Sequence, residues 1–238
     1  MNILGIAIEP IDRKGALSSV TNFLANPHFH RIVTVNPEFL IEAEKNKRFR
    51  RSLETASMRV IDGIGIVLFG YLQGIRLERY PGADLMTDIL RLAEKNKWSV
   101  FFAVNKRGLS SCEEILRATR NIFPQLLAGG ADFDFEEAAI RGADRVGEYD
   151  IIFCNAGAPA QEFFLERIGK NPGNLRLGMG VGGAFDFLTG KQRRAPKWIR
   201  VLGFEWLFRL ILQPKRWKRI WNAVSIFLFR AIFATIKK

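Results

Sequence analysis

The chain has 238 residues, of which 48% are hydrophobic and 25% charged, a balance typical of a globular protein with a full core. Its two cysteines, Cys112 and Cys154, exclude a disulfide framework and lack zinc-ligand spacing, which favours a reducing compartment. The N-terminal sequence has neither a basic leader nor a small-residue cleavage site, so we interpret it as a first strand and not as a signal peptide.

The positive charge is concentrated at the C-terminal end of the sequence. Residues 191–238 hold thirteen of the 36 lysines and arginines but only one of the 24 acidic residues, Glu205, so this segment accounts for the whole net charge of +12. It also holds four of the five tryptophans. This shift in composition predicts two domains, an α/β domain over residues 1–190 and a basic amphipathic appendage over residues 191–238.

Up to residue 190, short apolar runs alternate with helical patterns. Asn36 and Pro37 are suited to the cap and first position of the second helix. In chain order, the pattern predicts a strand over 2–8, a helix over 15–25, a strand over 31–36, a helix over 37–56, a strand over 58–62, a helix over 82–96, a strand over 98–104, a helix over 109–123, a strand over 125–133, a helix over 136–147, a strand over 149–157, a helix over 160–169 and a strand over 175–183. This alternation predicts an α/β fold with a mostly parallel sheet covered by helices on both faces.

Polar residues follow several of these strands. Because ligands of open α/β sheets bind beyond the carboxyl ends of the strands, we expect these residues to gather at one rim. They are Thr34, Asn36, Asp62, Asn105, Asn155 and the turn from Gly182 to Asp186.

The glycines of residues 178–183 have the spacing G-x-G-x-x-G of a dinucleotide-binding turn. That motif requires a long helix directly afterwards and a continuing βαβ unit, whereas here Gly190 and Pro196 interrupt the helix. NAD binding is therefore disfavoured. Glycines that admit a nucleotide or sugar close to the backbone, and a purely structural turn, both remain open.

Three sets of residues could carry chemistry. Asp62, at the end of a strand, is suited to general base catalysis or to capping the helix after it. Asp132 and Asp134 have the D-x-D spacing of a metal site, but acids are also favourable before a helix. His28 and His30 alternate onto one face without a third ligand nearby in sequence, so a metal site there is disfavoured.

The basic segment interleaves aromatic and aliphatic residues with arginine and lysine. Its apolar run over 223–236 is too short to span a bilayer and contains Arg230. Such composition is typical of segments that lie in an anionic membrane interface, and its many aliphatic residues favour lipid over nucleic acid. Two helices packed on the domain with a solvated basic face are the structural alternative.

Six motifs, in this order, resemble the WecG/TagA/CpsF family, glycosyltransferase family 26. They are TVNPE (34–38), IDGIGIV (61–67), RYPGADL (79–85), GAPAQE (157–162), GVGGAFDFLTGKQRRAP (180–196) and LGFEWLFRLILQPKR (202–216). The resemblance implies a Rossmann-like α/β domain with a membrane-docking C-terminal appendage, peripheral on the cytoplasmic face of a bacterial inner membrane.

The resemblance also implies an activity. Members are inverting glycosyltransferases that need no metal or cofactor and act in the synthesis of cell-surface polysaccharides. They transfer N-acetylmannosamine, its uronic acid, glucose or glucuronic acid from a UDP-sugar to a sugar on undecaprenyl diphosphate. We therefore expect a UDP-sugar donor, a polyprenyl-diphosphate-linked acceptor, an anionic membrane surface and no nucleic acid as partners, while a homo-oligomer stays open.

Individual roles follow from the motifs only as what the resemblance implies. Asp62 would be the catalytic base; the substrate-binding residues would be Thr34 and Asn36 for the sugar, Arg79 and Gln161 facing the substrates, Gly182, Gly183 and Asp186 for the uridine, and Arg194, Arg209 and Arg216 for the diphosphate. The chain departs from the family at Ala160, often a lysine, which leaves donor preference open. The alternative is a non-catalytic membrane-associated scaffold or nucleic-acid-binding module.

Overall fold

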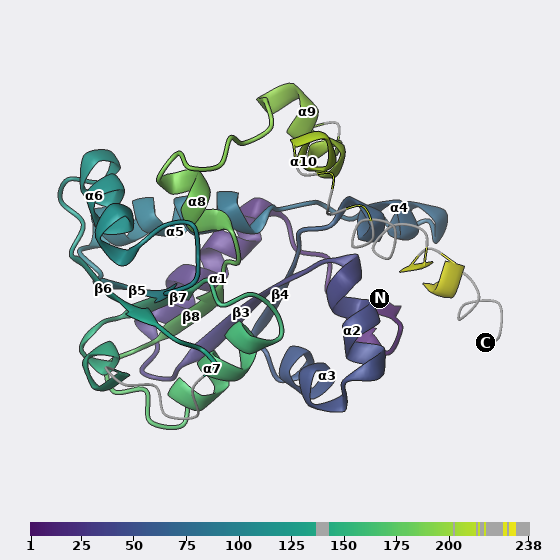
Figure 1. Cartoon of the computed structure of the whole chain (residues 1–238). Helices are drawn as coiled ribbons and strands as arrows, with labels where there is room; N and C mark the ends of the chain where they lie inside the picture. The colour runs from purple at the N-terminus through teal and green to yellow at the C-terminus, as the bar shows by residue number, and fades with distance from the viewer. Residues whose placement is uncertain are drawn as a thin grey trace.

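The computed structural model describes residues 1–136, 143–201, 203–212, 214, 217, 226–227 and 229–231. Its centre is a six-stranded parallel sheet in the order β4-β3-β8-β7-β5-β6 (Figure 1), which confirms the predicted parallel sheet. The strands are β3 (His30–Val35), β4 (Met58–Ile61), β5 (Val100–Asn105), β6 (Ala128–Phe133), β7 (Ile151–Cys154) and β8 (Leu177–Gly180).

Helices cover both faces of the sheet, which confirms the predicted α/β class (Figure 1). One face packs against α1 (Arg13–Ala25), α5 (Gly82–Asn96), α6 (Cys112–Ile122) and α8 (Ala184–Leu188). The other packs against α2 (Pro37–Lys45), α3 (Lys47–Glu54), α4 (Ile64–Leu72) and α7 (Ala160–Ile168). A short 3₁₀ helix, η1 (Ala143–Glu148), precedes β7, and α9 (Lys197–Val201) and α10 (Glu205–Leu212) lie in the basic segment.

Two expected elements are divided. The predicted helix over 37–56 is wrong as a single helix, because Asn46 ends α2 and its side chain accepts a hydrogen bond from Phe49 N, which caps α3. The predicted strand over 2–8 is also wrong. Leu4 and Gly5 have positive φ and turn the chain into an antiparallel hairpin of β1 (Asn2–Ile3) and β2 (Ile6–Ala7), outside the main sheet.

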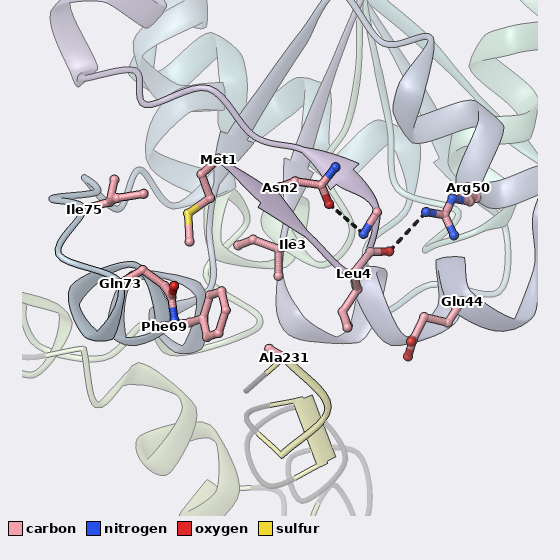
Figure 2. A pocket seen from close by; sticks show the side chains of 11 residues that line it. Met1, Asn2, Ile3, Leu4, Glu44, Arg50, Phe69, Gln73, Ile75 and Ala231 are labelled. Carbon is pink, nitrogen blue, oxygen red and sulfur yellow. Dashed lines mark hydrogen bonds between the residues drawn. The ribbon is translucent and has the colours of Figure 1, made fainter. Parts of the chain in front are cut away.

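Helix α4 entered the sequence analysis only as the helix that Asp62 could cap, without predicted bounds, and it is the element on which the C-terminal segment packs. Gly203 lies so close to α4 that a Cβ there would be 2.7 Å from Ile64. Phe227 is fully buried, with its ring 6.1 Å from the ring of Phe69. A pocket of about 520 Å³ lies near this junction. Figure 2 shows its lining, where Ala231 approaches Phe69 beside the N-terminal hairpin.

The predicted helix over 136–147 lies partly outside the described residues, since only Ala143–Glu148 is seen there as a 3₁₀ helix. The division of the chain into residues 1–190 and 191–238 stays a prediction.

Candidate active site

The carboxyl ends of β3, β4 and β8 form the rim on which the site is built. Val35 pairs with Ile61, and Asp62 N donates a hydrogen bond to Val35 O at 2.9 Å, so Asn36 and Asp62 leave neighbouring strands at one level. The loop after β3 leads to α2 on one face, whereas the loop after β8 leads to α8 on the other. Connections that diverge in this way open a crevice, the usual ligand site of such sheets.

The Asp62 carboxylate lies at this rim with about 33% of its side chain exposed. The adjoining helix α4 has Gly63 as its cap residue and no side-chain capping bond, so the alternative that Asp62 caps it is wrong. The nearest cation in sequence, Arg59, donates its hydrogen bonds to backbone oxygens such as Ala7 O and Leu53 O, whereas the fold places Arg79 Nη2 3.9 Å from Asp62 Oδ1. Asp62 is thus an accessible carboxylate with a positive group beside it.

Arg79 connects the rim to the basic segment. Its Nε donates to Asp62 O at 2.6 Å, its Nη1 to Arg200 O at 3.3 Å, and its Nη2 to the buried Glu205 carboxylate at 3.0 Å. These contacts hold the ends of α9 and α10 against the loop after β4. Arg79 was expected to face the substrates, and the structure gives it a bridging position that the sequence did not indicate.

Two arginines of the basic segment converge on Asp84, in the first turn of α5. Nη1 of Arg194 lies 2.7 Å and Nη1 of Arg200 3.3 Å from the same oxygen, Asp84 Oδ1. Among the described residues, Nε and Nη2 of Arg194 and Nε of Arg200 are buried and have no hydrogen-bond partner. Buried N–H donors of this kind are suited to phosphate oxygens, which accept charge-assisted hydrogen bonds from arginine.

A cavity of about 1120 Å³ lies beside this cluster. Tyr80 and Ile64 line it from the α/β domain, and Lys197 and Arg200 line it from the basic segment. Of the predicted arginines, Arg194 is in the cluster, the Arg209 side chain and Arg216 lie outside the described residues, and Arg200 was missed. The sequence signal that could have pointed to this cluster was the motif RYPGADL, because it contains both Arg79 and Asp84.

Gln161 positions the glycine turn. It is buried at the start of α7, and its Oε1 accepts hydrogen bonds from Gly182 N at 3.1 Å and Gly157 N at 3.2 Å. Gly180 must lack a side chain here, because a Cβ would lie 2.3 Å from Gln161 Nε2. The Nε2 group donates to Glu162, a buried carboxylate that the sequence did not single out.

The turn after β8 is open to the crevice. Gly182 has φ +49°, a conformation that favours glycine, and a Cβ built on it would meet nothing within 4 Å. Asp186 is buried below the turn, where it accepts a hydrogen bond from Ser110 Oγ at 2.8 Å. Ser110 precedes α6, so this bond ties the loop after β5 to α8. As far as the described residues go, the space above Gly182 is open for a ligand to approach the backbone.

The two residues predicted from β3 also reach the rim. Thr34 is buried against the first turn of α5, where a Cβ on Gly82 would lie 3.1 Å from the Thr34 methyl group. Asn36 caps α2 as predicted, with its Oδ1 accepting from Phe39 N at 3.0 Å. The rim thus brings together Thr34, Asn36, Asp62 and Arg79 from the β3 and β4 side and Gln161, Gly182, Gly183 and Asp186 from the β8 side.

A sequence model of the glycosyl transferase WecG/TagA/CpsF family matches residues 1–238. The chain belongs to this family. It is 34% identical over 192 residues to an N-acetylglucosaminyldiphosphoundecaprenol N-acetyl-beta-D-mannosaminyltransferase of Bacillus spizizenii, covering 79% of this chain and 74% of the relative. A Staphylococcus aureus (strain MRSA252) protein of the same name is 28% identical over 243 residues, covering 100% of this chain and 93% of the relative.

The protein is therefore a glycosyltransferase, which sets aside the alternative of a non-catalytic scaffold. Its fold also argues against NAD. Helix α8 is only five residues long and ends at Leu188, and β8 is the last strand in the described part of the chain. A dinucleotide turn requires a longer helix and a further strand at this point.

The remaining candidates in the glycosyltransferase are explained by local structure. Asp132 Oδ1 accepts a hydrogen bond from Cys112 N at 3.0 Å, and Asp134 pairs with Arg107 at 3.0 Å. His30 stacks on the Phe23 ring at 4.2 Å, and burial lowers its pKa. In the described ranges, no three histidine, cysteine or acidic residues are grouped as a metal site would require, and no helix is long and apolar enough to cross a bilayer.

Proposed function

We propose that this glycosyltransferase moves a sugar from a UDP-sugar to a sugar carried on undecaprenyl diphosphate, with inversion and without a metal, in the synthesis of a cell-surface polysaccharide. N-acetylmannosamine is the first donor sugar to test, because the relatives are named as N-acetylmannosaminyltransferases that act on N-acetylglucosaminyldiphosphoundecaprenol. Ala160 begins α7 where the family often has lysine, so a panel that includes UDP-glucose and UDP-glucuronic acid is needed as well.

Asp62 is the proposed catalytic base. An inverting transfer requires the acceptor hydroxyl to lose its proton as it attacks the anomeric carbon, and a positioned carboxylate assists such a step by roughly 10²- to 10⁴-fold. The Asp62 carboxylate is accessible at the rim, which supports this role. Thr34 and Asn36 lie beside it at the end of the paired strand β3, where they would contact the sugar.

The leaving diphosphate is the second requirement. It gains negative charge as the bond to the sugar breaks, and preorganised donors stabilise such charge. The observation that carries the proposal is the group of buried guanidinium N–H atoms of Arg194 and Arg200 that have no partner in the described part of the chain. Arg209 and Arg216 would add to this charge, and Gly182, Gly183 and Asp186 would hold the uridine.

The lipid-linked acceptor also explains the basic segment. We infer that residues 191–238 dock on the anionic cytoplasmic face of the membrane as a peripheral appendage. Each lysine or arginine near an anionic leaflet contributes about 1 kcal/mol to binding. The cavity beside Arg200 and Lys197 would then receive the acceptor from the membrane side.

The test is transfer by purified Asp62→Asn protein to a synthetic polyprenyl-diphosphate N-acetylglucosamine. We expect normal folding and a loss of about 10²- to 10⁴-fold in rate. Asp134→Asn is the matched control, because Asp134 belongs to the alternative D-x-D metal site and not to the proposed catalytic rim, and its variant should retain the rate. EDTA should leave wild-type activity unchanged. Near wild-type turnover by Asp62→Asn would remove Asp62 from the base role, and strict Mn²⁺ dependence would restore Asp132 and Asp134.

A further inference from the structure

The outer face of α4 is apolar and exposed. Leu68, Tyr71 and Leu72 are 48%, 80% and 63% exposed, and their spacing of three and four residues puts them on one side of the helix. The opposite side, which includes Ile66 and Phe69, is buried in the core. A surface helix normally presents polar residues to water, and a helix that is apolar all round is normally enclosed by protein or lipid.

Most other exposed large apolar side chains lie in the C-terminal segment. Of the twelve large apolar side chains that are exposed in the described residues, nine lie in α4 or after residue 197, including Trp198, Leu207 and Ile211. The other three lie around α6 and the start of β6, the opposite edge of the sheet from β4. The C-terminal segment packs on α4 at Gly203 and Phe227, so the exposed apolar side chains of α4 and of this segment belong to neighbouring elements. Figure 1 shows α10 near the start of α4.

Charge distinguishes between the two partners that could cover this face. Residues 191–238 carry the entire net charge of +12, so a second copy placed here would bring like charge against like charge. An anionic lipid surface has the complementary charge. Arg76 is exposed just after α4, where its long side chain can extend to lipid headgroups while the leucines lie deeper.

From these observations we infer that α4 is a membrane contact of the α/β domain itself, with Leu68, Tyr71 and Leu72 inserted among the lipids of an anionic leaflet. This inference rests on the proposed function, which puts the acceptor in a membrane. Nine residues of helix are about 13 Å long, so α4 would lie along the surface and not cross the bilayer.

The position of α4 links the membrane to the catalytic carboxylate. The helix begins two residues after Asp62, and the connecting Gly63 is packed so tightly that a Cβ there would lie 2.3 Å from the Pro37 ring. A rigid connection of this length holds Asp62 at a fixed height above the lipid surface. Insertion of α4 would therefore set the depth at which a lipid-linked sugar meets the base.

The direct test places an environment-sensitive NBD fluorophore on Tyr71→Cys in the full chain. Both native cysteines are buried, so the new thiol is the one that reacts. Leu127→Cys is the matched control, an exposed apolar position near the opposite edge. On vesicles of phosphatidylcholine and phosphatidylglycerol, the probe at 71 should shift to shorter wavelength and be quenched by nitroxide-labelled lipids, while the probe at 127 should not change. A water-like signal at 71 in protein that sediments with the vesicles would overturn the inference.

A second measurement uses the triple variant Leu68→Ser/Tyr71→Ser/Leu72→Ser. Its partitioning onto the same vesicles should fall at least about tenfold, because three apolar contacts are lost. The control Leu109→Ser/Ile122→Ser/Leu127→Ser should bind as wild type does. If sedimentation velocity instead shows that the α4 variant abolishes a dimer, the face joins two copies and the membrane assignment is wrong.

The failure of this inference can be separated from the failure of the proposed function. Wild-type protein should transfer sugar to a water-soluble acceptor with a short prenyl chain, and the α4 variant should do so at the same rate. Transfer to that acceptor together with a water-like probe at 71 would refute only the membrane role of α4. An inserted probe without any transfer would refute only the proposed function.

Discussion

Replacing Glu162 by glutamine tests the electrostatics beneath the glycine turn. Glu162 is 2% exposed, its Oε1 accepts a hydrogen bond from Gln161 Nε2 at 2.9 Å, and its Oε2 is buried without a partner among the described residues. Burial raises the pKa of this carboxyl from 4.5 to about 7, while the hydrogen bond from Gln161 and the charge of Arg31 oppose the rise. The folded protein therefore favours the neutral acid.

The size and sign of the effect follow from the two pKa values. A shift of this extent corresponds to about 3 kcal/mol between the two protonation states, at 1.36 kcal/mol per pKa unit. The folded state binds this proton more tightly than the unfolded state, because its pKa is raised. The resulting gain in the free energy of unfolding is fully present below pH 4.5 and is lost as the pH rises through about 7. Glutamine stays neutral at every pH, so the Glu162→Gln variant should not show this loss.

Urea unfolding followed by circular dichroism at pH 5, 6, 7 and 8 measures the difference. The free energy of unfolding of wild type should fall relative to Glu162→Gln by about 2.5 kcal/mol between pH 5 and 8, because part of the effect is already lost at pH 5. Glu9→Gln, at an exposed position after β2, is the control and should follow wild type. A constant difference between wild type and Glu162→Gln at all four pH values would refute the argument from burial.

Two further substitutions test the site. Gly182→Ala should fold at a cost of about 1 kcal/mol, because its φ is positive. It should also raise KM for the UDP-sugar, because the added methyl group enters the open space above the turn. Gly190→Ala is the control, since Gly190 also has a positive φ and open surroundings, and it should leave KM unchanged. An unchanged KM in Gly182→Ala would exclude the turn from donor binding. Glu205→Gln should weaken the buried contact with Arg79 by up to about 3 kcal/mol and so expose the basic segment to limited proteolysis. Glu44→Gln is the control: it loses a more exposed ion pair with Arg230 and should lower stability by under about 1 kcal/mol. Equal proteolysis of the two variants would mean that the Arg79 contact does not hold the segment.

The sheet was predictable because its signals are local. Apolar runs alternate with amphipathic segments, and Asn36 and Pro37 mark the start of α2 without any tertiary information. The bounds of helix α4 were not predicted, because α4 lacks such a local signal. Its sequence is apolar on every side, so it has no helical periodicity, and Gly65 and Gly70 lower its helix propensity. Its formation depends on packing against residues far along the chain, such as Phe227.

The candidate site was predictable in its residue types but not in its connections. Motif positions identified Asp62, Arg79 and Gln161, yet nothing in the sequence says that Arg79 reaches Glu205 or that Gln161 binds the turn through its carbonyl oxygen. Those contacts depend on side-chain direction after the strands have assembled. Glu162 and Arg200 were missed because a buried acid and a surface-like arginine look ordinary in sequence and acquire meaning only from their neighbours.

The bridge made by Arg79 has a consequence for biosynthesis. Its partners Arg200 and Glu205 follow it by 121 and 126 positions, and both are translated after β8 has completed the sheet. A growing chain on the ribosome thus contains all six strands of the described sheet before either partner of Arg79 has been made. A chain that ended shortly after residue 190 would have the sheet residues but neither contact that holds α9 and α10 against the loop after β4.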